Sequence, residues 1–205
     1  MTIGAFKEML KTAKSRIEAR QEEFSQLDAV LGDGDHGTAI VAAFNVLVKT
    51  AETGTEFKAM LTDMGFAVME ETSGSTSTLL GSFFLGMSDS AAGTELTPSA
   101  VKSMFASGLA NVQQQTKAKC GDKTMMDALI PGVEAMQSCD SDNVSDILAA
   151  GAAAALKGAE ATVQMKANFG RARNYGERSI GYADSGASSW SCMLAAFSES
   201  FNNQK

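Results

Sequence analysis

The sequence contains little proline, histidine or cysteine, and each shortage argues against a kind of fold or site. Two prolines occur in 205 residues, and β-branched residues never cluster into alternating runs, so no β-sheet is predicted. A single histidine and three widely separated cysteines without a CxxC pair argue against a zinc site and a disulfide framework. We therefore expect Cys120, Cys139 and Cys192 to be unpaired.

The chain also lacks long apolar runs and an excess of positive charge. No apolar stretch reaches the roughly 18–20 residues that span a bilayer, and the charged N-terminal segment lacks the apolar centre of a signal peptide. The formal net charge of −7 argues against a general nucleic-acid surface, which needs a basic face. We expect a cytoplasmic protein that binds neither membranes nor nucleic acids.

Helix-forming residues with a helical period dominate the sequence. The first segment places apolar residues at three- and four-residue steps, at Ile3, Phe6, Leu10, Ala13, Ile17 and Phe24. Similar patterns predict helices over residues 38–52, 56–72, 75–90, 98–117, 123–138, 143–168 and 185–203. Eight helices with mostly short connections predict one all-α domain over residues 1–205, in which successive helices are antiparallel neighbours. Small residues in 151–165 predict close packing of that helix.

Acidic residues concentrate after the first predicted helix. Asp28, Asp33 and Asp35 lie within eight residues of sequence. At an effective dielectric constant near 20, like charges about 4 Å apart repel by roughly 4 kcal/mol, so a cation is needed to hold them together. Mg²⁺ typically binds carboxylate and phosphate oxygens, and Gly32 and Gly34 let the backbone turn between the acids. The pattern predicts a magnesium site.

Other interpretations of this loop need to be weighed. Asp and Gly are common turn residues, and one aspartate could simply cap the helix that follows. An EF-hand calcium loop does not fit, because its twelfth position requires Glu and residues 39–41 are apolar. Residues 36–38 open the next helix, whose free amides suit a phosphate group.

Four segments resemble motifs of the L subunit of dihydroxyacetone kinases. LDAVLGDGDHGTAI at 27–40 matches that family's D-x4-GD-x-DHG signature. Further motifs match in the same order: GSTSTLLGSFF at 74–84, CGDKTMMDALIP at 120–131 and GRARNYGERSIGYADSGASS at 170–189. The resemblance spans nearly the whole chain. It implies a barrel of eight antiparallel amphipathic helices with the nucleotide site at one end.

The resemblance also implies a role for each matching residue. The catalytic metal ligands would be Asp28, Asp33 and Asp35, holding two Mg²⁺ ions that bridge the phosphates of ADP or ATP. The implied nucleotide contacts are His36, Gly37, Thr38, Ala39, Ser75, Thr76, Leu79, Thr116, Gly121, Met125, Arg171, Asp184 and Gly186. Arg171 would bind phosphate, and Leu79 and Met125 would face adenine. For His36, contact with nucleotide or metal-bound water is favoured over a phosphohistidine.

The implied activity is half of a kinase reaction. In that family a separate K subunit binds dihydroxyacetone, and an M subunit carrying a phosphohistidine rephosphorylates the bound ADP. We therefore expect a phosphotransferase subunit of a dihydroxyacetone kinase coupled to the phosphotransferase system. Two alternatives stay open: an ATP-using subunit for another small ketose or a carrier-bound fatty acid, and a nucleotide-binding partner of a transcriptional regulator.

Two short motifs of the family differ in this sequence. The family's SG-P motif is replaced by Ser77-Thr78, and its DPG motif is replaced by Asp184-Ser185-Gly186. Because serine replaces a rigid proline at position 185, the loop over the nucleotide is expected to be softer.

Overall fold

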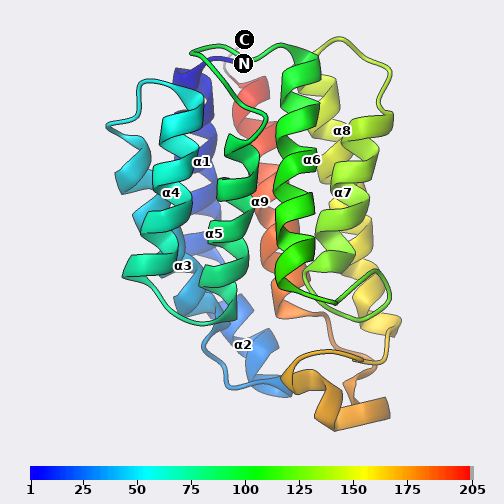
Figure 1. Cartoon of the computed structure of the whole chain (residues 1–205). Coiled ribbons are helices and arrows are strands. Elements are labelled where there is room, and N and C mark those ends of the chain that lie inside the picture. Colours follow the sequence, from blue (N-terminus) through cyan, green and yellow to red (C-terminus); the bar gives the residue numbers. More distant parts are fainter. Residues whose placement is uncertain (204–205) are drawn as a thin grey trace.

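The computed structural model describes residues 1–203 as helices joined by loops (Figure 1). The α-helices are α1 (Ile3–Ala19), α2 (Gln21–Leu31), α3 (His36–Ala51), α4 (Phe57–Glu71), α5 (Ser75–Ser88), α6 (Pro98–Gln115), α7 (Met126–Ser138), α8 (Val144–Ala161) and α9 (Ser185–Asn202). Two 3₁₀ helices, η1 (Thr162–Gln164) and η2 (Arg171–Ser179), lie between α8 and α9. These described residues form no β-strand, so the predicted all-α class is confirmed.

Within residues 1–203, eight of the helices are linked by a closed circuit of contacts. From α3 to α9 each helix packs on the next, and α1 packs on both α3 and α9. Successive helices of this circuit run in opposite directions along the bundle, and α2 lies at its lower end in Figure 1. From α3 to α9, successive helices are therefore antiparallel neighbours, as the sequence predicts.

Aromatic side chains tie helices together inside the bundle. Trp190 of α9 contacts Phe83 of α5 with ring centroids 5.3 Å apart. Phe6 of α1 contacts Phe57 of α4 at 5.7 Å and Phe197 of α9 at 6.2 Å. All five rings are buried, and such offset or edge-on pairs stabilise a core beyond the area they bury. The apolar stripes read from the sequence therefore meet in a common core.

Close packing of α7 against α8 depends on small residues. A Cβ added at Gly158 would lie 1.8 Å from the backbone oxygen of Asp127. Pro131, four residues after Asp127, cannot donate an amide hydrogen to that oxygen, so the oxygen can face α8 without breaking a helical hydrogen bond. A Cβ added at Gly132 would lie 3.2 Å from the Gly151 backbone oxygen. The predicted close packing of the small-residue helix is confirmed.

The prediction of one continuous first helix is wrong, because Arg20 separates α1 from α2. Arg20 has φ −112° and ψ 13°, outside the helical region. Its guanidinium donates to Glu23 at 2.6 Å and lies 4.9 Å from the centroid of the Phe24 ring, which stabilises the corner. Ile17 precedes the corner and Phe24 follows it, and both are buried. The helical spacing of apolar residues therefore continues across Arg20, and the sequence pattern does not indicate the break.

The up-and-down order brings four helix N-termini to the lower end of the bundle in Figure 1. Helices α3, α5, α7 and α9 begin there, and α2 and η2 lie beside them. The helix predicted over residues 143–168 ends earlier, at Ala161, and the predicted break over 170–184 contains η2. Helix N-termini carry a partial positive charge, so this end of the bundle is suited to anions.

Two expectations from composition concern cysteines and membranes. The three cysteines, Cys120, Cys139 and Cys192, are free, as predicted. None of the helices formed by residues 1–203 combines the length and apolar character that crossing a bilayer requires.

Candidate functional site

A cavity of about 640 Å³ lies at the end of the bundle where four of the described helices begin. Its wall includes residues from the first turns of α3, α5, α7 and α9, from the end of α2, and from the connection that contains η2. Small-molecule sites usually measure about 300–1,000 Å³. The cavity is therefore large enough for a nucleotide-sized ligand.

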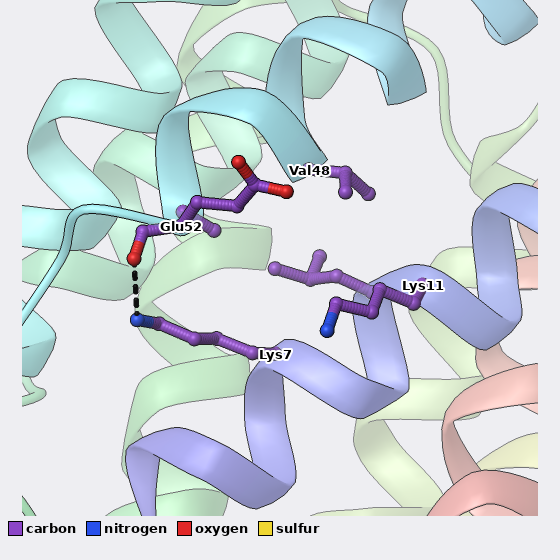
Figure 2. Close-up of a pocket in the computed structure, with 6 residues that line it drawn as sticks. Lys7, Lys11, Val48 and Glu52 are labelled. Carbon is purple, nitrogen blue, oxygen red and sulfur yellow. Dashed lines mark hydrogen bonds between the residues drawn. The ribbon is translucent and has the colours of Figure 1, made fainter.

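A second cavity, of about 130 Å³, lies between α1 and α3 (Figure 2). It is lined by Lys7, Leu10, Lys11, Val48, Ala51 and Glu52. Lys7 crosses from one helix to the other and donates from Nζ to the Glu52 backbone oxygen at 2.9 Å. The space is smaller than usual ligand sites, and lysine stems form much of its rim. The larger cavity is therefore the candidate functional site.

Asp28, Asp33 and Asp35 meet on the wall of the larger cavity. One carboxylate oxygen from each residue lies within 4.8 Å of the other two. Hard divalent cations such as Mg²⁺ prefer oxygen ligands, carboxylates among them. The three residues fit the metal site that the sequence predicts, because α2 and the loop after it bring their oxygens together.

Hydrogen bonds orient the carboxylate of Asp28 on both sides. Its Oδ2 accepts from the Gly34 N–H at 2.8 Å, and its Oδ1 accepts from the Ser185 hydroxyl at 3.2 Å. A Cβ added at Gly32 would lie 2.7 Å from Asp28 Oδ1, so a side chain there would displace the carboxylate. Gly34 has φ +80°, a conformation that favours glycine. The two glycines thus let the acidic loop form.

The side chain of Asp35 tests the alternative interpretation, in which an aspartate of the loop only caps the following helix. Asp35 is the N-cap residue of α3, but its side chain accepts no capping hydrogen bond. Its carboxylate is exposed and available to a cation. Asp33, also exposed, forms an ion pair with Arg171 of η2. The helix-cap interpretation is therefore wrong for Asp35.

His36 lines the cavity, and both of its ring nitrogens have hydroxyl partners. Nδ1 lies 3.2 Å from Thr76 Oγ1, and Nε2 lies 2.8 Å from Ser189 Oγ. Burial lowers the pKa of the ring, and the Asp28 carboxylate opposes this shift. Because Thr76 belongs to α5 and Ser189 to α9, the His36 ring joins the first turns of these two helices at the cavity.

The first turn of α5 offers backbone amides to the cavity. Gly74, its N-cap residue, has φ +93° and no side-chain cap, and a Cβ added there would meet open space. Ser75 and Thr76 follow and line the cavity. Uncapped amides at a helix N-terminus are well suited to phosphate oxygens. This is the arrangement expected for the phosphate end of a nucleotide.

Apolar side chains line another part of the cavity wall. Leu79 and Met125, which the family resemblance assigns to adenine, both contribute. Further apolar residues that were not predicted join them, among them Leu27, Met126 and Trp190. Apolar and aromatic surface of this kind can cover the faces of a planar base.

Most residues expected at the site do line the cavity. Besides the three aspartates they are His36, Ala39, Ser75, Thr76, Leu79, Thr116, Met125, Arg171, Asp184 and Gly186.

Gly37, Thr38 and Gly121 are not part of its wall. A Cβ added at Gly37 would lie 2.1 Å from the Gln21 backbone oxygen, so Gly37 serves the packing of α3 on α2. Thr38 Oγ1 accepts from Gln21 Nε2 at 3.4 Å. Gly121, at φ +92°, shapes the turn before α7, where its N–H donates to Asp127 Oδ1 at 2.6 Å.

Asp184 caps α9 from the cavity wall. Its Oδ2 accepts from the Ala187 N–H at 2.7 Å. Burial raises the pKa of the Asp184 carboxyl to about 7. The Ala187 N–H and the Lys123 ammonium oppose the rise, and the Asp127 carboxylate adds to it. The side chain therefore lies in a less solvated environment than Asp33 and Asp35.

Sequence reasoning missed Lys123, Ser185 and Ser189 as residues that build the site. Ser185 and Ser189 orient Asp28 and His36 from α9, far along the chain. Lys123 is 1% exposed and lines the cavity. The one signal for Lys123 was its place in the CGDKTMMDALIP motif. A charged residue in a polar loop otherwise suggests an exposed position.

The fold and the cavity define an all-α protein with a cluster of three aspartates beside uncapped helix amides and an apolar wall. The chain belongs to the DAK2 domain family, whose model matches residues 30–199.

Relatives in this family match nearly the whole chain. Over 200 residues the chain is 34% identical to the "PEP-dependent dihydroxyacetone kinase 2, ADP-binding subunit DhaL" of Listeria innocua, covering 94% of this chain and 93% of the relative. Over 183 residues it is 33% identical to the "PEP-dependent dihydroxyacetone kinase, ADP-binding subunit DhaL" of Escherichia coli, covering 87% of each.

A solved structure shares the fold. The dihydroxyacetone kinase from C. freundii in complex with AMP-PNP and Mg²⁺ superposes with a TM-score of 0.73 at 22% sequence identity. The match covers 95% of this chain and 33% of that chain, so this chain spans about a third of the larger protein. At 22% sequence identity, this structural similarity supports the all-α fold alone.

Proposed function

We propose that this chain is the ADP- and Mg²⁺-binding phosphotransferase subunit of a dihydroxyacetone kinase. The observation that carries the proposal is the meeting of oxygens from Asp28, Asp33 and Asp35 within 4.8 Å, on a cavity where α5 begins without a cap. The names of the Listeria and Escherichia relatives describe ADP-binding subunits, which agrees with such a cavity. In this proposal residues 1–205 act as one nucleotide-binding domain.

Each part of the cavity has a task in the proposed reaction. The three aspartates would hold two Mg²⁺ ions, which neutralise charge on phosphate oxygens during transfer. The α5 amides beside Ser75 and Thr76 would bind phosphate, and the apolar wall would bind the base. These residues position the nucleotide, and phosphoryl transfer depends on positioning and charge neutralisation more than on covalent work by the protein.

Arg171 would exchange one anionic partner for another when the nucleotide binds. Its guanidinium pairs with Asp33 in the structure. Once Asp33 binds a cation, Arg171 is free to turn its N–H groups to a phosphate, the anion that suits an arginine fork. The Arg171 side chain is 67% exposed, so this exchange of partners requires no change in the core.

Other chains would complete the reaction. In the proposal a K subunit supplies the dihydroxyacetone site, and an M subunit with a phosphohistidine returns the phosphoryl group to bound ADP. Asp33 and Asp35 are exposed, so the phosphate end of the cavity is accessible to a partner protein. In a relay through bound ADP, this chain needs only the residues that bind Mg²⁺ and the phosphates, because other chains supply the phosphoryl donor and the acceptor.

Reconstitution with K and M subunits tests the proposal. ³¹P NMR should show a phosphoryl group passing from the phosphohistidine protein to ADP on this chain, and then to dihydroxyacetone. ADP at the concentration of the chain should suffice, because ADP acts as a retained cofactor. If transfer requires excess ATP and none occurs from the phosphohistidine, the relay is wrong and an ATP-using kinase subunit replaces it.

Mg²⁺ and ADP together should stabilise the folded chain. At about 100 times the dissociation constant, a ligand specific for the folded state adds roughly 2.7 kcal/mol to the free energy of unfolding. For a protein of this size the midpoint of thermal unfolding should rise by about 5–10 °C. Scanning fluorimetry with and without EDTA measures the effect. A rise that persists in EDTA would contradict binding through the aspartates.

A further inference from the structure

Lys123 is a buried cationic side chain on the cavity wall that the proposed transfer step does not use. The residue is 1% exposed. Its backbone has φ +59°, a left-handed conformation that is unfavourable for residues with a Cβ. Burying an ammonium group is also unfavourable unless it is hydrogen-bonded. Both features persist only where other contacts fix this residue in place.

The Lys123 ammonium donates to two carbonyl oxygens from one distant segment. These are the backbone oxygens of Thr162 and Tyr182. They lie near the two ends of residues 162–184, the connection between α8 and α9, which we name the η1–η2 connection. One side chain in the turn before α7 therefore joins both ends of this connection. The Asp184 N–H, which donates to Thr162 Oγ1 at 3.0 Å, adds a further bond at the same place.

The η1–η2 connection and the residues after it reach the predicted nucleotide site. Asp184 caps α9 two residues after Tyr182. The next residue, Ser185, donates to Asp28 Oδ1 at 3.2 Å. Within the connection, Arg171 pairs with Asp33. A shift of the Tyr182 end would therefore move groups on both the nucleotide wall and the metal loop.

Two carboxylates lie near the ammonium group. Burial lowers the pKa of Lys123, and both Asp184 and Asp127 oppose this shift. Asp127 is itself 2% exposed and accepts from the Gly121 and Thr124 N–H groups at 2.6 and 2.8 Å. These two hydrogen bonds hold the turn that carries Lys123 against Asp127, in the first turn of α7.

We propose that Lys123 is a positioning residue of the nucleotide site, which fixes the η1–η2 connection to the turn before α7. It holds Asp184 and Gly186 against the cavity and keeps the Ser185 hydroxyl on Asp28. This inference rests on the proposed binding of Mg²⁺–ADP, and it assigns to Lys123 no contact with the reacting atoms.

Replacing Lys123 by methionine tests the proposal, because methionine keeps an unbranched apolar stem and removes the ammonium group. Because the variant loses hydrogen bonds from a charged donor, the dissociation constant of Mg²⁺–ADP should rise by about 10–100-fold. Titration calorimetry measures this change. Amides of residues 181–187 should exchange hydrogen faster, whereas those of α4 and α5 should not. Lys123→Arg, which keeps the charge and the donors, should recover part of the affinity.

Lys102→Met is the matched control. Lys102 of α6 also donates from Nζ to a backbone oxygen on another segment, that of Cys139. This bond lies near the start of α6 and the end of α7, and these helix ends are at the opposite end of the bundle from the cavity (Figure 1). This variant should lower the midpoint of unfolding without changing the affinity for Mg²⁺–ADP. A merely structural role for Lys123 predicts the same result for Lys123→Met.

The outcomes separate this inference from the proposed function. If folded Lys123→Met binds Mg²⁺–ADP as tightly as the unmodified chain, the positioning role is wrong. If the unmodified chain itself fails to bind Mg²⁺–ADP, the proposed function fails, and hydrogen exchange at residues 181–187 still decides whether Lys123 holds the connection. Should Lys123→Met not fold, Lys123→Gln, which keeps one donor group, is judged by the same two measurements.

Discussion

Replacing Asp35 by asparagine should abolish Mg²⁺-dependent nucleotide binding and reduce phosphoryl transfer by about 10²–10³-fold or more. Asparagine keeps the size of the side chain but removes one of the three negative charges that meet within 4.8 Å. The fold does not depend on this carboxylate, because it makes no capping hydrogen bond at the start of α3. Removing a like charge from the cluster should leave the midpoint of unfolding without Mg²⁺ unchanged or slightly higher.

Asp63→Asn provides the control for charge. Asp63 is exposed on α4, outside the cavity wall, so this variant makes the same change in net charge without touching the acidic loop. Calorimetry with Mg²⁺–ADP, thermal unfolding and ³¹P-detected transfer should show normal behaviour for Asp63→Asn. Equal nucleotide affinity in the two variants would mean that the aspartate cluster does not hold the metal.

Replacing Gly158 by alanine should lower the free energy of unfolding by about 3 kcal/mol, at the upper end of ordinary overpacking effects. The added Cβ would lie 1.8 Å from the backbone oxygen of Asp127, and a backbone atom cannot move aside as a flexible side chain does. Helix α8 would have to separate from the start of α7. Urea unfolding should report the loss, and the thermal midpoint should fall by about 6–12 °C.

The same substitution should also weaken nucleotide binding. The side chain of Asp127 accepts from the Gly121 and Thr124 N–H groups and so holds the turn beside the cavity. Gly4→Ala is the control, because Gly4 is an exposed helical glycine of α1 where an added Cβ meets its nearest atom at 3.9 Å. It should be neutral or stabilise the chain by up to about 1 kcal/mol. Similar effects from both glycines would show that the α7–α8 contact is looser than described.

Helices were predictable wherever the apolar period reflected burial within one element. The corner at Arg20 was not, because Ile17 and Phe24 are both buried and preserve the spacing across it. The acidic loop was predictable for another reason. Asp28 and Asp35 are near in sequence, and a short glycine-containing loop keeps them near in space.

Site residues were harder to predict where tertiary contacts decide which way a side chain faces. Gly37 and Thr38 lie only two and three residues after Asp35, yet the turn of α3 places Gly37 against α2 and Thr38 beside Gln21. Ser185 builds the site through a bond to a residue 157 positions away. Local sequence patterns do not predict that Ser185 and Asp28 meet, because their contact depends on how the helices pack in the closed circuit.

That closed circuit has a consequence for the order in which the chain folds. The aspartates occur early in the sequence, but the hydroxyl that supports Asp28 comes from α9, the helix that closes the circuit against α1. During synthesis the acidic loop is made long before that support exists, and joining distant segments is a slow step because loop closure costs entropy. Nucleotide binding should therefore appear only at the last stage of folding, when the C-terminal helix docks.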